Sequence, residues 1–366
     1  MSSEPTPLDG FLAEIPKVEL HVHLEGSMRP STLLALARKH GVELPASDIQ
    51  GLRRWFRFQD FEHFVSVYLT VSEVLRDPED FHRLALDVME RQARERIVYS
   101  ETHFTISTHT ARGLDGDGIL EALDTACREG RRRYETELAL IPDIVRNVPV
   151  ERADLTFDWA LAGRERGMVV ALGLSGIEGH PDEPFREHFR RAEREGLHRV
   201  AHAGEHGGPE SIRSALEVAH AERIGHGVRA VEDPALVREL AQSRVPLEVC
   251  PTSNLCLGVF PDLPSHSFDR LYRAGVALSV SSDDPPLFNT TLVREYQELA
   301  RTFGYSAEEM AGFALAGLQH SFLPADRKSR LEERFRQRFR ELGKTHLGRP
   351  VVPESAPSVP PAPPTG

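Results

Sequence analysis

The chain has 366 residues, of which 40% are hydrophobic and 27% charged, so it can bury a large core and falls within the size range of one barrel domain. Its formal net charge is -12, from 44 basic and 56 acidic residues, which argues against nucleic acid as a partner. Three cysteines are too few for a disulfide framework, and neither a signal peptide nor a membrane span is visible, so we expect a cytoplasmic protein.

Eight short apolar or β-rich segments occur along the chain, each followed by a polar turn and then by a helical pattern. They are residues 17–25, 97–105, 137–145, 168–175, 198–205, 223–227, 246–254 and 276–284. Strands that alternate with helices form a parallel sheet, and eight such units predict a closed (β/α)8 barrel, the TIM-barrel fold. Ionisable residues gather near the C-terminal ends of these segments, which is the barrel end where active sites are built.

About 70 residues separate the first two predicted strands, far more than a loop between a strand and a helix needs. Within them, residues 56–75 carry apolar side chains near helical periodicity. We expect a helix here that lies over the barrel mouth as a lid, followed by a second helix over residues 80–94. The alternative is that this helix packs in the ordinary way against the side of the barrel.

The C-terminal segment, residues 348–366, has a different composition. It holds seven prolines and shows no apolar periodicity, so it cannot contribute to a core. We therefore predict one catalytic domain over residues 1–347 and a disordered, proline-rich tail over residues 348–366.

The first predicted strand ends with two histidines, His21 and His23. Side chains two residues apart on a strand point to the same face, so both imidazoles can meet one ion inside the barrel mouth. Taken alone, the pair fits an ordinary surface or core histidine pair equally well.

The fifth and sixth segments add further chemistry. His202 ends the fifth segment, and Glu205 follows three residues later at the predicted rim. A helix-capping role would explain Glu205 but not His202. In the sixth segment His226 lies between two glycines, which allow the backbone to approach a ligand closely.

The eighth segment delivers two adjacent carboxylates, Asp283 and Asp284, to the same end of the barrel. Neighbouring buried carboxylates repel each other, so a cation or a hydrogen-bonding ligand is required. Three imidazoles and one carboxylate favour zinc, with water at the remaining position of a catalytic site. Iron, cobalt and manganese stay open as alternatives.

These motifs resemble those of the adenosine deaminase family, within the amidohydrolase superfamily of metal-dependent barrels. The resemblance runs from about Pro16 to near Gly343 and includes PKVELHVHLEGS, VAHAGE, RIGHG, VCPTSN and SSDDPPLF in family order. It implies a zinc-dependent hydrolytic deaminase, in which water replaces the 6-amino group of a small 6-aminopurine and ammonia is released. No Cys-x-x-Cys motif of the cysteine-ligated deaminases occurs in the chain.

The resemblance also implies roles for individual residues. Four would bind one zinc ion per subunit: His21, His23, His202 and Asp283. Glu205 would protonate N1 of the purine, and His226 would orient and polarise the attacking water. Asp284 would accept a hydrogen bond from purine N7, and Gly176 would offer its backbone N–H to N3.

The sequence departs from the best-known adenosine deaminases near the substrate. Glu25 stands where they have an aspartate that contacts the ribose, and its longer side chain is expected to intrude on that space or to move the sugar. Gly173 also replaces an aspartate of the fourth strand. Residues 99–109 resemble bacterial relatives whose substrates include aminodeoxyfutalosine, an adenine nucleoside with a modified 5′ side. We expect adenosine as the first candidate substrate, with aminodeoxyfutalosine or adenine as the alternative.

Two other classes of protein share parts of this pattern. Metal hydrolases that cleave amides, lactones or phosphoesters usually bridge two metals with a carboxylated lysine at the end of strand four, and no lysine occurs near Ser175. A purine-binding protein that had lost its activity would normally lack a metal ligand or the acid, and this chain retains all of them.

Overall fold

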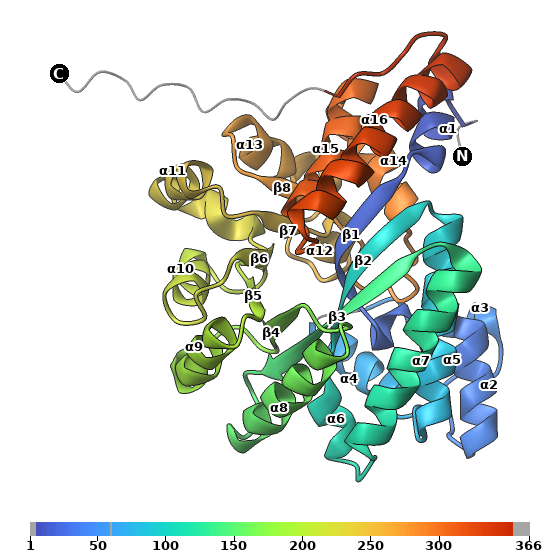
Figure 1. The fold of residues 1–366 in the computed structure, drawn as a ribbon, viewed down its shortest axis with the longest axis vertical. Helices are drawn as coiled ribbons and strands as arrows, with labels where there is room; N and C mark the ends of the chain where they lie inside the picture. The colour runs from blue at the N-terminus through green and yellow to red at the C-terminus, as the bar shows by residue number, and fades with distance from the viewer. Residues whose placement is uncertain (1–4, 59–60, 354–366) are drawn as a thin grey trace.

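The computed structural model describes residues 5–58 and 61–353, which form an eight-stranded parallel barrel surrounded by helices (Figure 1). The strands follow one another in chain order: β1 (Lys17–His23), β2 (Ile97–Phe104), β3 (Glu137–Val145), β4 (Ala171–Ser175), β5 (His198–Ala203), β6 (Arg223–His226), β7 (Leu247–Val249) and β8 (Leu278–Val280). The ring closes beside β8, where the N–H of His23 donates to the carbonyl of Asp283 at 2.9 Å and the N–H of Asp283 donates to the carbonyl of His21 at 3.1 Å. The predicted (β/α)8 fold is confirmed.

Helices pack around the outside of the barrel (Figure 1). Those that follow β2 to β8 are α6 (Ile106–Thr110), α7 (Gly116–Tyr134), α8 (Glu151–Glu165), α9 (Arg186–Arg194), α10 (Pro209–Glu217), α11 (Pro234–Ser243), α12 (Pro251–Cys256), α13 (Phe268–Arg273) and α14 (Leu292–Phe303). Single turns of 3-10 helix are η1 (Glu25–Ser27), η2 (Glu183–Phe185), η3 (Val228–Glu232) and η4 (Leu263–Ser265). The flank beside β8 and β1 is covered by α1 (Pro7–Glu14), α15 (Ala307–His320) and α16 (Ala325–Leu347). Within the described ranges, every helix is too short or too polar to cross a bilayer.

The long segment between β1 and β2 forms four helices: α2 (Pro30–His40), α3 (Ile49–Trp55), α4 (Phe61–Ser72) and α5 (Pro78–Arg94). The carboxylate of Asp77 caps α5 and Pro78 begins it, which explains why this helix starts before the predicted residue 80. α4 occupies only part of the predicted range 56–75. Its side chains line the cavity at the barrel mouth, so the predicted lid position is confirmed.

The predicted domain boundary coincides with the end of α16. There Gly348 adopts a left-handed φ of 69°, a conformation that glycine adopts without strain. The residues just beyond it pack on the domain, because Val351 is buried against Gly343 and Arg349 pairs with Glu308. The rest of the predicted tail, residues 354–366, lies outside the described residues.

An ionic network fills part of the barrel interior beneath the mouth. Arg223 on β6 is buried between two carboxylates, 2.6 Å from Glu101 Oε2 and 2.5 Å from Glu248 Oε1. The other oxygen of Glu248 lies 2.9 Å from His21 Nδ1. Although burial raises it, the positive charge of Arg223 lowers the pKa of Glu248 to about 2. Glu101, near the end of β2, therefore belongs to this inner network.

Replacement of Arg223 by leucine is expected to lower the free energy of unfolding by about 3–5 kcal/mol, because it removes the buried cation that lies between two buried carboxylates. Denaturant unfolding followed by circular dichroism measures the loss. The matched control is Arg213→Leu, since Arg213 pairs at the surface with Asp233, and there we expect less than about 1 kcal/mol. Equal losses in the two variants would contradict the account of the network.

Candidate active site

The four predicted metal ligands converge at the C-terminal end of the barrel. His21 and His23 project from the end of β1, His202 from β5, and Asp283 from the turn after β8. Asp283 Oδ1 lies 3.2 Å from His23 Nε2 and 3.6 Å from His21 Nε2. The Nε2 atoms of His23 and His202 are 3.2 Å apart. The three imidazoles and the carboxylate therefore surround one point.

The hydrogen bonds behind this cluster fit a metal ion. His21 Nδ1 bonds with Glu248 at 2.9 Å, and His202 Nδ1 donates to the carbonyl of Leu174 at 3.1 Å. Such bonds orient metal-binding histidines and leave Nε2 free for the ion. His21 Nε2 is buried and has no hydrogen-bond partner among the described residues. Three imidazole nitrogens and one carboxylate oxygen form a donor set that suits zinc.

The electrostatics of the cluster also favour a positive charge at its centre. Burial disfavours the charged imidazole, yet the neighbouring carboxylates of Asp283 and Glu248 raise the pKa of His21 to about 10. For Asp283, burial raises the pKa, but the neighbouring imidazoles of His21 and His23 outweigh burial and hold it well below its ordinary value. Groups that attract protons this strongly would exchange them for a metal ion.

The two glycines beside His226 serve a different purpose from the one we expected. A Cβ on Gly225 would lie 2.6 Å from the His21 ring, and a Cβ on Gly227 would lie 2.6 Å from a methyl group of Leu247. The glycines therefore make room for neighbouring side chains of the barrel. His226 itself has a left-handed φ of 64°, an uncommon conformation that occurs often at functional sites.

Glu205 and His226 lie beside the ligand cluster. His226 Nε2 is 3.7 Å from Glu205 Oε1 and 4.0 Å from Asp283 Oδ2. Glu205 Oε1 is buried and makes no hydrogen bond within the described part of the chain. Glu178, which the sequence analysis did not identify, holds the loop that carries this acid: it accepts hydrogen bonds from the N–H groups of Glu205 at 2.9 Å and His206 at 2.8 Å.

A cavity of about 360 Å³ opens above these residues and is lined by both polar and apolar side chains. Its polar lining comprises the candidate site residues His23, His202, Glu205, His226, Asp283 and Asp284, together with Tyr68, Thr105, Thr108, Asn147, Ser175, Glu178 and His206. Its apolar walls include side chains of the lid helix α4 and of two loops: Phe61, Phe64, Val65, Leu69, Val148 and Leu257. Gly176 also lines the cavity with φ 91°, and a Cβ there would lie 2.5 Å from Asn147 Oδ1.

Asp284 is a buried member of the cavity lining. Burial and the neighbouring charge of Asp283 raise its pKa well above the ordinary value, which favours the protonated carboxyl group, a hydrogen-bond donor. Gly26 packs directly against it, because a Cβ on Gly26 would lie 1.5 Å from Asp284 Oδ1. The absence of a side chain at residue 26 thus fixes the position of Asp284.

Glu25, which we expected to contact the substrate, is not among the residues that line the cavity. Its buried carboxylate accepts hydrogen bonds from the N–H of Thr105 at 3.1 Å and from His109 Nε2 at 3.0 Å. Arg112 donates to His109 Nδ1 at 2.7 Å, so the proton of the ring is on the nitrogen that faces Glu25. These polar groups bind the Glu25 carboxylate. The side chain therefore does not enter the ribose space on which we expected it to intrude.

A buried pair next to the ligands, His103 on β2 and Asp143 on β3, was also missed. His103 Nδ1 lies 2.9 Å from Asp143 Oδ1, and its ring centroid is 4.7 Å from that of His21. Asp143 fits because β4 carries Gly173, where a Cβ would lie 1.9 Å from Asp143 Oδ1. The best-known adenosine deaminases carry an aspartate on strand four. In this chain that residue is Gly173, and the buried carboxylate beside it is Asp143 of strand three. The sequence feature that could have identified this pair is a polar residue at an inward-facing position of each of the two strands.

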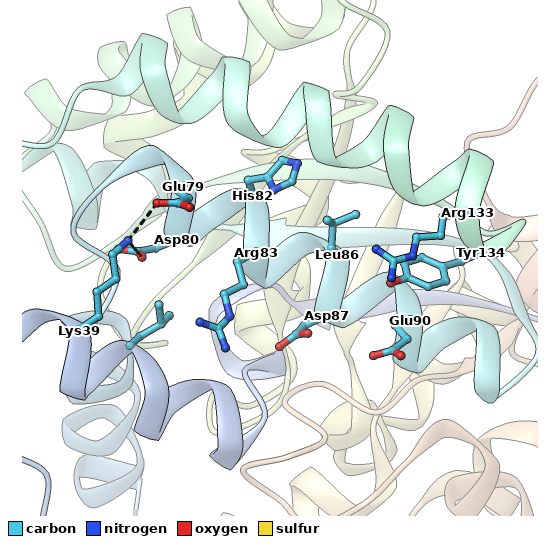
Figure 2. A pocket seen from close by; sticks show the side chains of 11 residues that line it. Lys39, Glu79, Asp80, His82, Arg83, Leu86, Asp87, Glu90, Arg133 and Tyr134 are labelled. Atoms are coloured by element: carbon cyan, nitrogen blue, oxygen red, sulfur yellow. Dashed lines mark hydrogen bonds and ion pairs between the residues drawn. The ribbon is translucent and has the colours of Figure 1, made fainter.

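A second pocket lies on the outer surface between α2, α5 and α7 (Figure 2). Its ionic side chains pair with one another: Lys39 lies 2.8 Å from Asp80 and 3.4 Å from Glu79. None of the predicted site residues lines it. The barrel mouth is therefore the candidate active site.

A (β/α)8 barrel with three imidazoles and a carboxylate at the C-terminal ends of its strands has the architecture of a metal-dependent hydrolase. The sequence profile of the adenosine deaminase family matches residues 16–338. The chain belongs to the adenosine deaminase family, and it is a hydrolytic deaminase.

Its relatives bear on the substrate and the metal. The chain is 39% identical over 331 residues to an aminodeoxyfutalosine deaminase from Streptomyces coelicolor, covering 90% of this chain and 86% of the relative. The structure of an adenine deaminase from Arthrobacter aurescens matches with a TM-score of 0.84 and 32% identity, over 88% of this chain and 98% of that one. An amidohydrolase from Burkholderia ambifaria with bound Zn matches with a TM-score of 0.86 and 25% identity, over 95% and 96% of the two chains. These names favour the alternative substrates over adenosine, which the sequence analysis placed first.

Proposed function

We propose that the protein deaminates the purine of an adenine nucleoside that carries a modified 5′ group, as in aminodeoxyfutalosine, with zinc as its cofactor. The observation that carries the proposal is that one cavity is lined both by the candidate catalytic residues and by apolar side chains of the lid helix. Its volume of about 360 Å³ lies within the range of pockets that enclose small molecules. A bare adenine would contact the candidate catalytic residues and leave the space beside the lid helix unfilled.

The apolar walls also argue against adenosine as the preferred substrate. Phe61 and Phe64 on the lid, and Leu257 in a neighbouring loop, offer no hydrogen bonds to an unmodified 5′ hydroxyl. Glu25, which replaces the ribose-contacting aspartate of the best-known adenosine deaminases, is bound to His109 instead. An apolar 5′ substituent would bury its surface against these walls and stabilise the complex.

The metal would be held by His21, His23, His202 and Asp283, the residues whose donor atoms surround one point. When bound, the ion supplies a water that is nucleophilic near neutral pH, since such an ion lowers the pKa of water from 15.7 to about 7. The residues around it determine where the purine lies and where protons move.

Glu205 is placed to donate a proton to purine N1, which takes up negative charge when oxygen adds to C6. His226 Nε2 faces the space between Glu205 and Asp283 and would orient the attacking oxygen there. The backbone N–H of Gly176 would bind N3. Proton transfer to the amine and cleavage of its bond to C6 then release ammonia.

The direction of the bond to purine N7 differs from the direction we expected. N7 of a 9-substituted adenine is a hydrogen-bond acceptor, so it cannot donate to Asp284. N7 requires a donor, and the raised pKa of Asp284 favours its protonated form, so we assign Asp284 as the donor to N7.

Replacement of Gly26 by alanine tests this assignment. The added methyl group would overlap Asp284 Oδ1 and displace the carboxyl group from N7, so we expect KM to rise by about tenfold, the equivalent of one hydrogen bond of about 1.4 kcal/mol. Steady-state kinetics on the preferred purine measures it. Gly116→Ala, whose methyl group would meet its nearest neighbour at 3.4 Å, is the control and should leave KM unchanged. An unaltered KM in Gly26→Ala would exclude the proposed bond.

The substrate is tested by comparing kcat/KM for aminodeoxyfutalosine, other 5′-modified adenosines, adenosine and adenine. We expect the 5′-modified nucleosides to exceed adenosine by at least about tenfold. A preference for adenine would instead favour the second candidate, an adenine deaminase, which the Arthrobacter aurescens structure supports. The wall variant Phe64→Ala should reduce kcat/KM for the modified nucleosides more than for adenine. Absence of turnover for every 6-aminopurine would contradict the proposed function altogether.

A further inference from the structure

A chain of hydrogen bonds runs from the backbone to the imidazole of His226. The N–H of Phe268 donates to His266 Nδ1 at 3.0 Å, and His266 Nε2 lies 3.1 Å from Asn254 Oδ1. The amide nitrogen of Asn254 lies 3.3 Å from His226 Nδ1. Neither Asn254 nor His266 lines the substrate cavity.

The direction of every bond in this chain follows from its first member. A backbone N–H can only donate, so His266 Nδ1 must accept and carries no proton. Burial lowers the pKa of His266 to about 3, so the ring is neutral and its single proton is on Nε2. This N–H donates to Asn254 Oδ1.

The orientation of the Asn254 amide is thereby determined. If the amide were turned over, its nitrogen would face His266 Nε2, and two donors would meet. With the oxygen toward His266, the amide N–H donates to His226 Nδ1, which must accept. A neutral His226 then has its proton on Nε2, the nitrogen that faces the cavity. All three side chains are buried, so water does not replace any of these bonds.

We infer that Asn254 and His266 are positioning residues that hold His226 in the tautomer with the proton on Nε2. The Nε2–H then points between Glu205 Oε1, at 3.7 Å, and Asp283 Oδ2, at 4.0 Å, where the proposed function places the attacking oxygen. His226 donates a hydrogen bond to that oxygen and stabilises its negative charge. It does not remove a proton in the resting enzyme, which leaves Glu205 as the group that exchanges protons with the substrate. The catalytic part of this inference rests on the proposed function, whereas the tautomer does not.

Asn254→Asp reverses the direction of the last bond. An ionised carboxylate only accepts, so it requires a proton on His226 Nδ1 and removes the donor from the cavity side. We expect kcat to fall by about 100-fold or more, as in hydrolases whose catalytic histidine is held in the wrong tautomer, with KM within about threefold and metal content unchanged. Two variants of His266 test the next bond in the chain. His266→Gln keeps a donor toward Asn254 and should retain most of kcat. His266→Phe removes the donor and should lose most of kcat.

The tautomer is read directly by nitrogen NMR of zinc-loaded protein labelled with 15N-histidine, with His226→Asn to assign the signals. The parent should show a proton on Nε2 of His226 and an unprotonated Nδ1, and Asn254→Asp should show the reverse. A proton on Nδ1 of His226 in the parent would overturn the inference. This result does not depend on which substrate the enzyme accepts. An Asn254→Asp variant that retains kcat within tenfold would also overturn it. If Asn254→Asp fails to fold, the parent spectrum and the His266 pair decide the question. If the spectra show the expected tautomers but the protein turns over no 6-aminopurine, the positioning of His226 is supported and the proposed function is excluded.

Discussion

Glu205→Gln is expected to lower kcat by a factor of about 10²–10⁴ while the bound metal stays at the parent level. Glutamine has nearly the same shape as glutamate but cannot donate the proton that N1 of the purine requires. Glu205 is not among the four proposed metal ligands, and its Oε1 is buried without a hydrogen-bond partner among the described residues, so this oxygen is free to bind a substrate.

Steady-state kinetics and elemental analysis on the same preparation separate the two effects of this substitution. The matched control is Glu210→Gln, an exposed carboxylate in the first turn of α10, which should leave kcat and metal content unchanged. A Glu205→Gln enzyme within tenfold of the parent would show that another group protonates the purine.

His202→Ala is expected to lower the zinc content to well below one ion per chain and to abolish turnover. The substitution removes one of four ligand atoms, and a site with the remaining two imidazoles and one carboxylate binds zinc much more weakly. His82→Ala, at the surface of α5, is the control and should retain the metal. Full metal content in His202→Ala would remove this histidine from the ligand set.

The sequence predicted the barrel and the clustering of the four proposed metal ligands, because strand alternation and the fold together decide where these side chains lie. The alternation of side chains along a strand decides that His21 and His23 share a face, and the fold brings the C-terminal ends of all strands together. The lid helix was predictable from its apolar periodicity, although α4 is shorter than the pattern suggested.

Other features depend on contacts between residues far apart in the sequence. Glu25 turns away from the cavity because His109, 84 residues later, offers it a proton. The position of Asp143 depends on Gly173 of the next strand, and the orientation of Asn254 depends on a backbone N–H beyond His266. Each of these is a matter of side-chain direction, which residue type and spacing do not specify.

We expect one metal ion, held by His21, His23, His202 and Asp283, to support deamination of a 6-aminopurine. The most direct measurement is a zinc titration of chelator-treated protein, with ammonia release from aminodeoxyfutalosine and adenine followed at each addition. We predict negligible turnover without metal and a plateau at one zinc ion per chain. Full activity in metal-free protein, or a plateau only at two ions per chain, would contradict the account.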